Sequence, residues 1–219
     1  MVLANENPAR ERILERIRTG LRVVVPDPPA GPIGTGVIFT PVENPLERFQ
    51  QEAKANLMEC LPAGDDASGT EHLKQVLESL SDGEIYVQDD PALRRMIESV
   101  QTQRPIRWSS QGAPREESQA TVTLVDALIA QTGSIFVTAA CGGRGASVVA
   151  PCHIAVARAS QLVPDLQTAL RSATQQGKLE QNSFACVISG SSRTADIEKI
   201  LVQGAHGPRR LVVVLLTGA

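Results

Sequence analysis

The chain has 219 residues and a formal net charge of −3, and aromatic residues make up only 3% of it. A charge so close to balance predicts no nucleic-acid footprint, and so few aromatic side chains leave little for stacking on bases. No apolar run approaches the ~18 residues of a membrane span, and the first residues lack a signal-peptide pattern. We therefore expect a cytoplasmic protein without a membrane span, made of one large or two small domains.

An amphipathic helix and a connector are expected before the main domain. The helix starts at Asn7-Pro8, and one face of it carries the apolar residues Ile13, Leu14, Ile17 and Leu21. Residues 25–45 are rich in proline and glycine, which suits either a plain linker or an arm that packs on another subunit. The apolar run Val37-Ile38-Phe39 favours the arm, and with it a homo-oligomer formed through the N-terminal arm. We expect residues 1–45 to form this helix and arm, and residues 46–219 to form one α/β domain.

From residue 46 onward, helical and strand patterns alternate. Helices are expected over 46–61, from Thr70, from Asp90-Pro91 and from Pro164, with a short turn or helix over 126–131. Strands are expected over 84–88, 105–108, 121–124, 134–138 and 153–157. This rhythm predicts an α/β fold with a Rossmann-like, mostly parallel sheet covered by helices.

The C-terminal part of the chain predicts strand, turn, helix and strand in succession. Residues 184–188 and 211–216 are short apolar runs typical of buried strands. Between them, Gly190-Ser191-Ser192 suits a sharp turn and a helix N-cap, and Gly204 suits the end of that helix.

A ligand site is the sharper interpretation of that turn. A helix N-terminus presents free backbone N–H groups, and Arg193 would add a cationic fork for an anion. The alternative is that Ser192 merely caps the helix and Arg193 lies in solvent. A second small-residue loop, 139–147, also follows a strand, so both loops could border one crevice at the sheet edge. The candidate ligand-binding residues are Gly190, Ser191, Ser192, Arg193, Thr194, Gly143 and Arg144.

The cysteines and histidines show no spacing typical of a metal site. None of the four cysteines forms a C-x-x-C pair, and the three histidines lie far apart. We expect no intrinsic metal or cofactor, with His153 as a structural hydrogen-bonding group. Cys141 is a candidate reactive thiol, because Arg144 could lower its pKa.

Three ordered segments carry a resemblance. GSSRTADIE with AHGP, from residue 190, is similar to GPSRTADIE and GVHGP; DALIAQTGS, 126–134, is similar to AIAETGT; and APCHIAV, 150–156, is similar to LPPVHIAVV. These are segments of the LUD domain family, which includes lactate utilisation protein C. Ser191 stands where the family usually has proline. Gln131 stands where it usually has glutamate, which keeps the hydrogen-bonding shape and loses the charge.

The resemblance implies a fold similar to the NagB/RpiA/CoA-transferase-like superfamily. It also implies a component of an L-lactate utilisation system, in which L-lactate is oxidised to pyruvate with iron–sulfur partner proteins. This chain would be a non-redox subunit with a crevice for a small carboxylate or phosphorylated ligand, and the iron–sulfur clusters would lie on the partners. The alternative is a stand-alone enzyme of the CoA-transferase or sugar-phosphate-isomerase type. Such an enzyme needs a base or nucleophile, for which His206 and Asp126 are the candidates.

Overall fold

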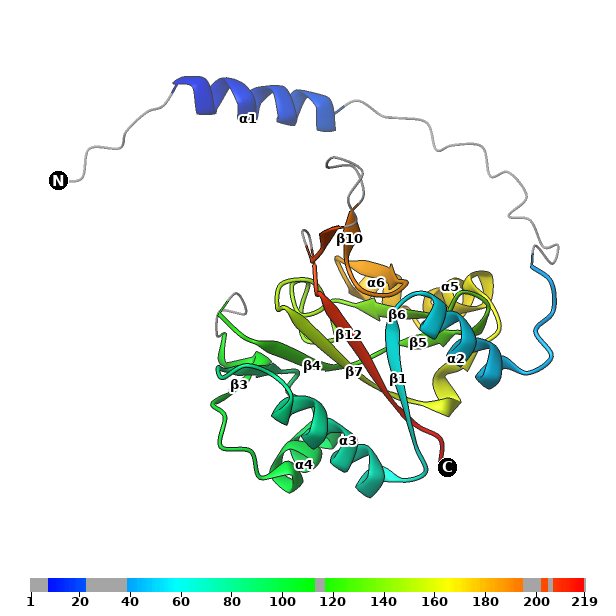
Figure 1. The fold of residues 1–219 in the computed structure, drawn as a ribbon. Helices are drawn as coiled ribbons and strands as arrows, with labels where there is room; N and C mark the ends of the chain where they lie inside the picture. Colours follow the sequence, from blue (N-terminus) through cyan, green and yellow to red (C-terminus); the bar gives the residue numbers. More distant parts are fainter. Residues whose placement is uncertain (1–7, 23–38, 113–116, 195–201, 205–206, 219) are drawn as a thin grey trace. The chain divides into compact units, whose positions relative to one another are not determined.

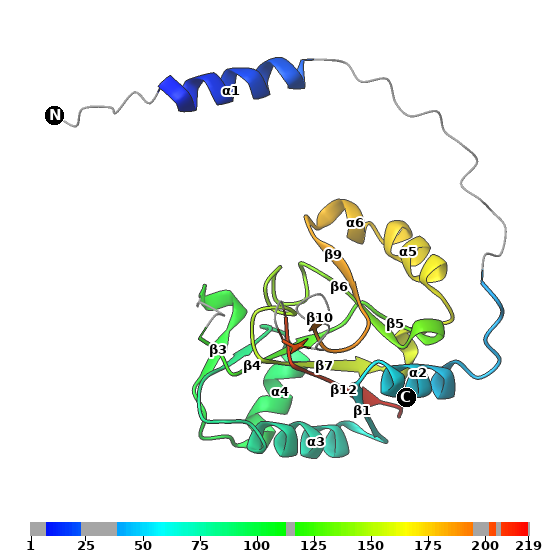
Figure 2. The ribbon, with the colours of Figure 1, turned by 45° about the horizontal axis from the view of Figure 1, so that its top comes forward.

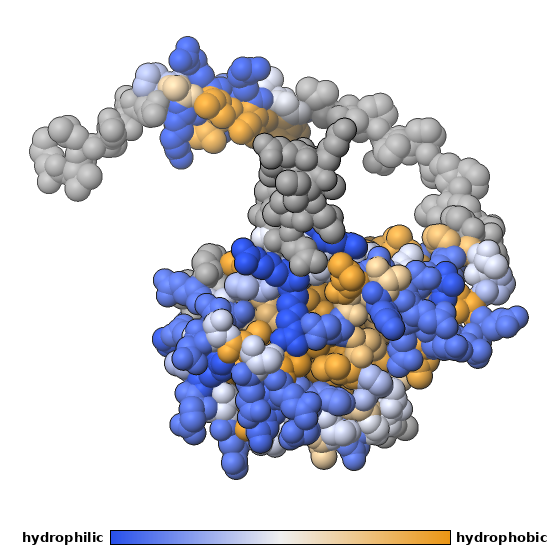
Figure 3. Space-filling model, viewed as in Figure 1, coloured by the Kyte–Doolittle hydropathy of each residue, from blue (hydrophilic) through white to orange (hydrophobic). Residues whose placement is uncertain are grey.

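The computed structural model describes residues 8–22, 39–112, 117–194, 202–204 and 207–218 (Figure 1). The chain divides after residue 38 into two units. The first contains helix α1 (Pro8–Leu21), as predicted. Within this unit, Ile13 is 59% and Leu21 81% exposed, and Figure 3 shows an apolar stripe between charged groups of the helix. The apolar run at 37–39 lies mostly outside the described residues.

A six-stranded parallel sheet forms the centre of the second unit. Its spatial order is β1 (Met58–Ala63), β12 (Arg210–Leu216), β7 (Cys152–Arg158), β4 (Ala120–Leu124), β2 (Ile85–Val87) and β3 (Ile106–Trp108). Every pairing between these neighbours is parallel. β12 is buried from Leu211 to Leu216, because it lies between two strands and two covering layers. The predicted parallel sheet is confirmed.

Helices α3 (Asp66–Glu78) and α4 (Pro91–Val100) cover one face of this sheet. The side chains of Val212, Val214 and Leu216 pack in one core cluster with Leu73 of α3 and Leu93 of α4. α3 starts four residues before the predicted Thr70, because Asp65 forms a capping box with Ser68.

A second sheet and helix α2 (Pro45–Ala55) cover the other face. The second sheet has the order β8 (Leu162–Val163), β5 (Ala127–Ile129), β6 (Ser134–Thr138) and β9 (Ala185–Ile188). Helix α5 (Leu166–Gln175) packs on its outer side through Ala169 and Ala173, and α6 (Lys178–Gln181) follows. Figure 2 shows the resulting layers: α3 and α4, the parallel sheet, the second sheet, and α5 with α6. The short 3₁₀ helices η1 (Ser109–Gln111), η2 (Ala130–Thr132) and η3 (Ala159–Gln161) lie in the connections.

The prediction of a helix through residue 61 was wrong. α2 ends at Ala55, and Leu57 takes a left-handed backbone conformation with φ 58°. The chain then turns into β1, which pairs with β12 along its length. Residues 57–60 fit a helical period, but pairing with the central strand overrides such a local preference. Pro62 is tolerated in β1 because that strand forms the edge of the sheet.

Three more local predictions were wrong. Residues 127–129 form β5, rather than a turn or helix, because they pair with β6 and β8. The strand at 185–188 is not buried, since β9 is the edge of the second sheet and Val187 is 37% exposed. The predicted helix after residue 192 is replaced at both described ends by an antiparallel pair, β10 (Arg193–Thr194) with β11 (Val202–Gln203). Residues 195–201 lie outside the described residues.

Candidate functional site

The predicted ligand-binding segment at residues 190–194 leads into the β10–β11 pair, and its last two residues form β10. The Ser192 N–H donates to the carbonyl oxygen of Pro208 at 2.8 Å, and the Ser192 carbonyl oxygen accepts from the Gly204 N–H at 2.9 Å. Gly190 has φ 93°, and a side chain there would meet the carbonyl oxygen of Asn56. Ser191 is buried and Arg193 is exposed. The Ser192 N–H that a helix N-terminus would leave free for an anion is therefore bonded within the protein.

The second loop of the predicted crevice, which contains Gly143 and Arg144, forms hydrogen bonds with other segments of the chain. The Gly143 N–H donates to the carbonyl oxygen of Ala139 at 2.8 Å, and the Arg144 Nε donates to the Ser183 hydroxyl at 3.2 Å. β6 and β9 run antiparallel, with Thr138 paired to Ala185, so the segments after β6 and β9 leave opposite ends of this strand pair. The Arg144 guanidinium thus lies beside Ser183, before the start of β9, whereas Arg193 follows the end of β9. The two loops therefore do not border one crevice through this strand pair.

Of the two catalytic candidates, the structure describes Asp126, whereas His206 lies outside the described residues. The side chain of Thr194, a predicted ligand-binding residue, is also outside them. The Asp126 carboxylate accepts from Lys178 Nζ at 2.7 Å, from the Thr138 N–H at 2.8 Å and from the Cys141 thiol at 3.3 Å. Burial raises the pKa of Asp126, but the bonds from Lys178 and Thr138 outweigh it and leave the pKa below its ordinary value. Such a carboxylate is an ionised structural clamp and a weak base.

Two further buried groups, Cys141 and His153, are structural. Burial, with the Asp126 charge, raises the pKa of Cys141 to about 12, which argues against the interpretation that Arg144 lowers the pKa of this thiol. His153 is completely buried, and its Nε2 lies 2.9 Å from the Thr123 hydroxyl. Burial lowers the pKa of His153 to about 4, so this imidazole is neutral at pH 7, as the prediction of a structural histidine requires.

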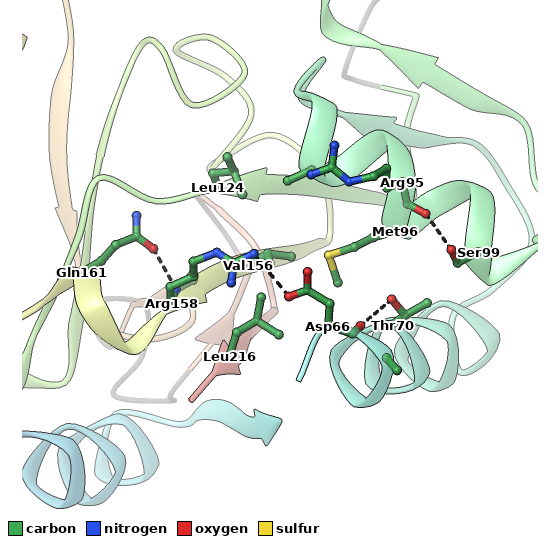
Figure 4. A pocket seen from close by; sticks show the side chains of 13 residues that line it. Asp66, Thr70, Arg95, Met96, Ser99, Leu124, Val156, Arg158, Gln161 and Leu216 are labelled. Atoms are coloured by element: carbon green, nitrogen blue, oxygen red, sulfur yellow. Dashed lines mark hydrogen bonds and ion pairs between the residues drawn. The ribbon is translucent and has the colours of Figure 1, made fainter. Parts of the chain in front are cut away.

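A cavity of about 510 Å³ lies at the carboxyl ends of three neighbouring strands, β4, β7 and β12 (Figure 4). It is bordered by the first turn of α3 and by α4, and its lining consists of Asp66, Ala67, Thr70, Ala92, Arg95, Met96, Ser99, Leu124, Val156, Ala157, Arg158, Gln161 and Leu216. The carboxyl ends of parallel strands are where open α/β sheets bind ligands. This cavity is therefore the candidate functional site.

The polar rim of the cavity is partly fixed by hydrogen bonds. The Gln161 amide donates to the Val125 carbonyl oxygen at 2.6 Å and accepts from the Arg158 N–H at 2.7 Å, which fixes the chain where β7 ends. The Arg158 guanidinium reaches across the cavity mouth to the Asp66 carboxylate at 3.2 Å. Arg95 projects from α4 over the same space (Figure 4). Two guanidinium groups and one carboxylate thus border the cavity, together with the hydroxyls of Thr70 and Ser99.

Sequence reasoning did not find this cavity. Its residues come from five separated stretches of the chain and form no motif. One signal was available, since Arg158 follows directly on a strand that was predicted correctly. The side of the cavity that carries Asp66 could not be predicted, because Asp66 begins the helix that follows β1, and β1 was predicted as part of a helix.

Within the described residues, no three His, Cys, Asp or Glu side chains gather where they could hold a metal ion. No described helix is long and apolar enough to cross a membrane.

The layers and the cavity at the carboxyl edge define a Rossmann-like α/β protein. The chain belongs to the LUD domain family, whose model matches residues 46–216. It is 27% identical over 154 residues to "Lactate utilization protein C" of Macrococcus caseolyticus, covering 67% of each chain. It is 35% identical over 98 residues to "Lactate utilization protein C 1" of Bacillus mycoides, covering 43% of this chain and 42% of that relative, less than half of its length.

The fold is similar to a crystal structure of a DUF162 family protein from Deinococcus radiodurans. The TM-score is 0.56 at 19% identity, and the match covers 80% of this chain and 96% of that one. This likeness supports the fold assignment on a basis independent of the sequence motifs.

Proposed function

We propose that this protein is a component of an L-lactate utilisation system, in which L-lactate is oxidised to pyruvate together with iron–sulfur partner proteins. The observation that carries the proposal is the LUD domain match over residues 46–216, with relatives named lactate utilization protein C on two separate alignments. In this proposal the partners carry the clusters and the electrons, and this chain binds a ligand.

The cavity supports a ligand-binding role. It lies at the sheet edge where Rossmann-like proteins bind small molecules, and Arg95 and Arg158 give it two groups suited to a carboxylate or phosphate. The proposal places the protein in the cytoplasm, which is supported by four cysteines that are all unpaired. Residues 190–194, with Gly143 and Arg144, do not line this cavity, and their role in binding a ligand stays a separate prediction.

Growth on L-lactate tests the proposal directly. A strain that lacks this protein is grown with L-lactate as the carbon source, and in parallel with pyruvate. We expect growth to be lost on L-lactate and kept on pyruvate, and to return when the wild-type chain is supplied. Unchanged growth on L-lactate would contradict the proposal.

Partner binding needs a separate measurement. The tagged full chain is purified from cells grown on L-lactate, and the co-purifying material is assayed for iron and acid-labile sulfide. The proposal expects both in amounts stoichiometric with a bound protein, and a control purification from cells grown on pyruvate should contain less.

A second candidate is a stand-alone enzyme of the transferase or isomerase type. One observation favours this enzyme: the described lining of the cavity includes a carboxylate, that of Asp66, beside the Arg158 guanidinium. Turnover of an acyl-CoA or a sugar phosphate by the purified chain, abolished in Asp66→Asn, would support this candidate. The absence of turnover with both substrate classes would leave the partner-dependent role as the better account.

A further inference from the structure

We infer that the cavity at the carboxyl ends of β4, β7 and β12 binds an amphipathic organic anion, a molecule that joins an apolar ring or chain to a phosphate or carboxylate. The inference rests on the proposed function in taking this cavity as the functional site, and it adds the chemical class of the ligand. It also implies that lactate itself is not the molecule that fills the site.

The floor of the cavity is apolar and continuous with the core. Met96, Val156 and Leu216 belong to the cluster between the sheet and the two helices, and each is less than a tenth exposed. Leu124 packs against that cluster at the end of β4. A wholly polar ligand would leave this surface without apolar contacts, whereas an apolar ring or chain removes it from water.

The two arginines supply the site for the anionic group. The ion pair of Arg158 with Asp66 is open to water, since the two side chains are 47% and 66% exposed. Exposed pairs contribute little to stability, so a ligand anion can replace Asp66 on the guanidinium at small cost. The backbone of Arg158 is already fixed by Gln161, which reduces the entropy lost on binding. Arg95 approaches from α4 on the opposite wall (Figure 4).

The N-terminus of α3 does not compete for that anion. The Asp65 carboxylate accepts from the Ser68 N–H at 2.8 Å, and the Ser68 hydroxyl with this backbone bond lowers the pKa of Asp65. The helix end is thus occupied by the protein's own negative charge, and Asp66 adds a second one. Electrostatics therefore directs the anionic group to the two arginines, and leaves Asp66 and Thr70 for ligand hydroxyls.

The volume of the cavity suits a ligand larger than lactate. Cavities of about 300–1,000 Å³ bind ligands of nucleotide or drug size. The cavity of about 510 Å³ falls within this range. L-lactate and pyruvate are far smaller, and either could satisfy an arginine without touching the apolar floor.

Calorimetric titration of the purified full chain tests the ligand class. Adenosine monophosphate and octanoate are the amphipathic anions, one with a ring and phosphate, the other with a chain and carboxylate. Inorganic phosphate and L-lactate serve as anions alone, and adenosine and octanol as apolar groups alone. We expect one amphipathic anion or both to bind at least ten-fold tighter than every single-feature compound. Binding of neither below about 1 mM, or tighter binding of L-lactate, overturns the inference.

Three variants tie the binding to the cavity. Arg95→Gln and Arg158→Gln should each lower the affinity for the amphipathic anion about ten-fold. Ala92→Phe should abolish binding, because the larger side chain fills the cavity. Arg107→Gln is the matched control, because Arg107 forms an ion pair with Glu84 at 2.6 Å away from the lining. All four changes are at positions that are not fully buried, and circular dichroism checks that each variant is folded. Unchanged affinity in the three cavity variants, or an equal loss in Arg107→Gln, contradicts the inference.

The outcome is separable from that of the proposed function. If no amphipathic anion binds but growth on L-lactate still requires the protein, the ligand class is wrong and the proposed function stands. If such an anion binds at the two arginines but growth on L-lactate is unaffected, the ligand class stands and the lactate role is wrong.

Discussion

The Lys178 ammonium lies 2.7 Å from the Asp126 carboxylate, joining the short helix α6 to the beginning of β5. The Asp126 side chain is 10% exposed and that of Lys178 is 32% exposed, so the pair is shielded from solvent more than any other ion pair of described residues. The same carboxylate accepts the Thr138 N–H, which anchors the end of β6. One carboxylate therefore connects three segments of the second sheet layer.

Lys178→Met should destabilise the protein at pH 7. Methionine retains most of the apolar stem and removes the charge, so the largely buried Asp126 carboxylate loses its cation. We expect a loss of about 1–3 kcal/mol in the free energy of unfolding, measured by urea titration. Arg48→Met is the control, because Arg48 and Glu52 form an ion pair at 2.9 Å that is considerably more exposed. Its expected effect is within about 0.5 kcal/mol, and equal effects of the two substitutions would contradict the clamp.

The buried imidazole of His153 predicts acid sensitivity. Burial lowers its pKa from 6.5 to about 4 in the folded chain, so the unfolded chain binds more protons between these values. Stability is therefore complete above pH 6.5 and falls as the pH drops toward 4, by about 3 kcal/mol from this group. Urea titrations at intervals from pH 7 to pH 4.5 measure this slope.

His153→Gln is the comparison for that slope. Glutamine can still bond to Thr123 but does not titrate, so the free energy of unfolding of this variant should change less over the same pH interval. Asp126 is common to both proteins, and its pKa is lowered from 3.8, so its contribution is lost at more acidic pH. Identical pH slopes in the two proteins would show that His153 does not cause the acid sensitivity.

Gly133 permits the close approach of α2 to the second sheet. Its φ is 57°, and a side chain there would collide with the backbone of Glu52 and Ala53. Gly112 has a similar φ of 64° but faces open space. Gly112→Ala should cost about 1–2 kcal/mol from the left-handed backbone alone, and Gly133→Ala about 1–3 kcal/mol more from the collision. The difference in urea midpoint measures this contact, and equal midpoints would mean that α2 can shift without cost.

Local sequence signals predicted the layers better than they predicted the site. The runs at 211–216 and 134–138 are apolar and β-branched, so they identify buried strands without any tertiary information. Residues 57–61 are different, because their side chains fit a helical period, and only pairing with β12 makes them a strand. The left-handed Leu57 that separates α2 from β1 carries no sequence signal, since leucine rarely takes this conformation.

That single error hides the cavity. With β1 taken as part of a helix, Asp66 is no longer the residue that opens a helix at the end of a strand. The sequence then gives no indication that Asp66 lies beside Arg158, which is 92 residues later in the chain. The motif at residues 190–194 drew attention instead, because a resemblance marks which residues recur but not which of them line a cavity. The spatial order of the strands β1, β12, β7 and β4, which no local pattern encodes, brings the two rims together.

The exposed apolar face of α1 predicts an interaction through the N-terminal arm. Ile13, Ile17 and Leu21 are each more than half exposed within their own unit, and burying such side chains stabilises by about 1.5–3 kcal/mol apiece. Deletion of residues 1–40 should therefore lower the oligomeric mass of the protein measured by light scattering. Ile13→Asp with Ile17→Asp should do the same in the full-length chain, whereas Arg12→Ala with Arg16→Ala, on the same helix, should not. An unchanged mass in both the deletion and the aspartate variant would mean that the arm does not join subunits.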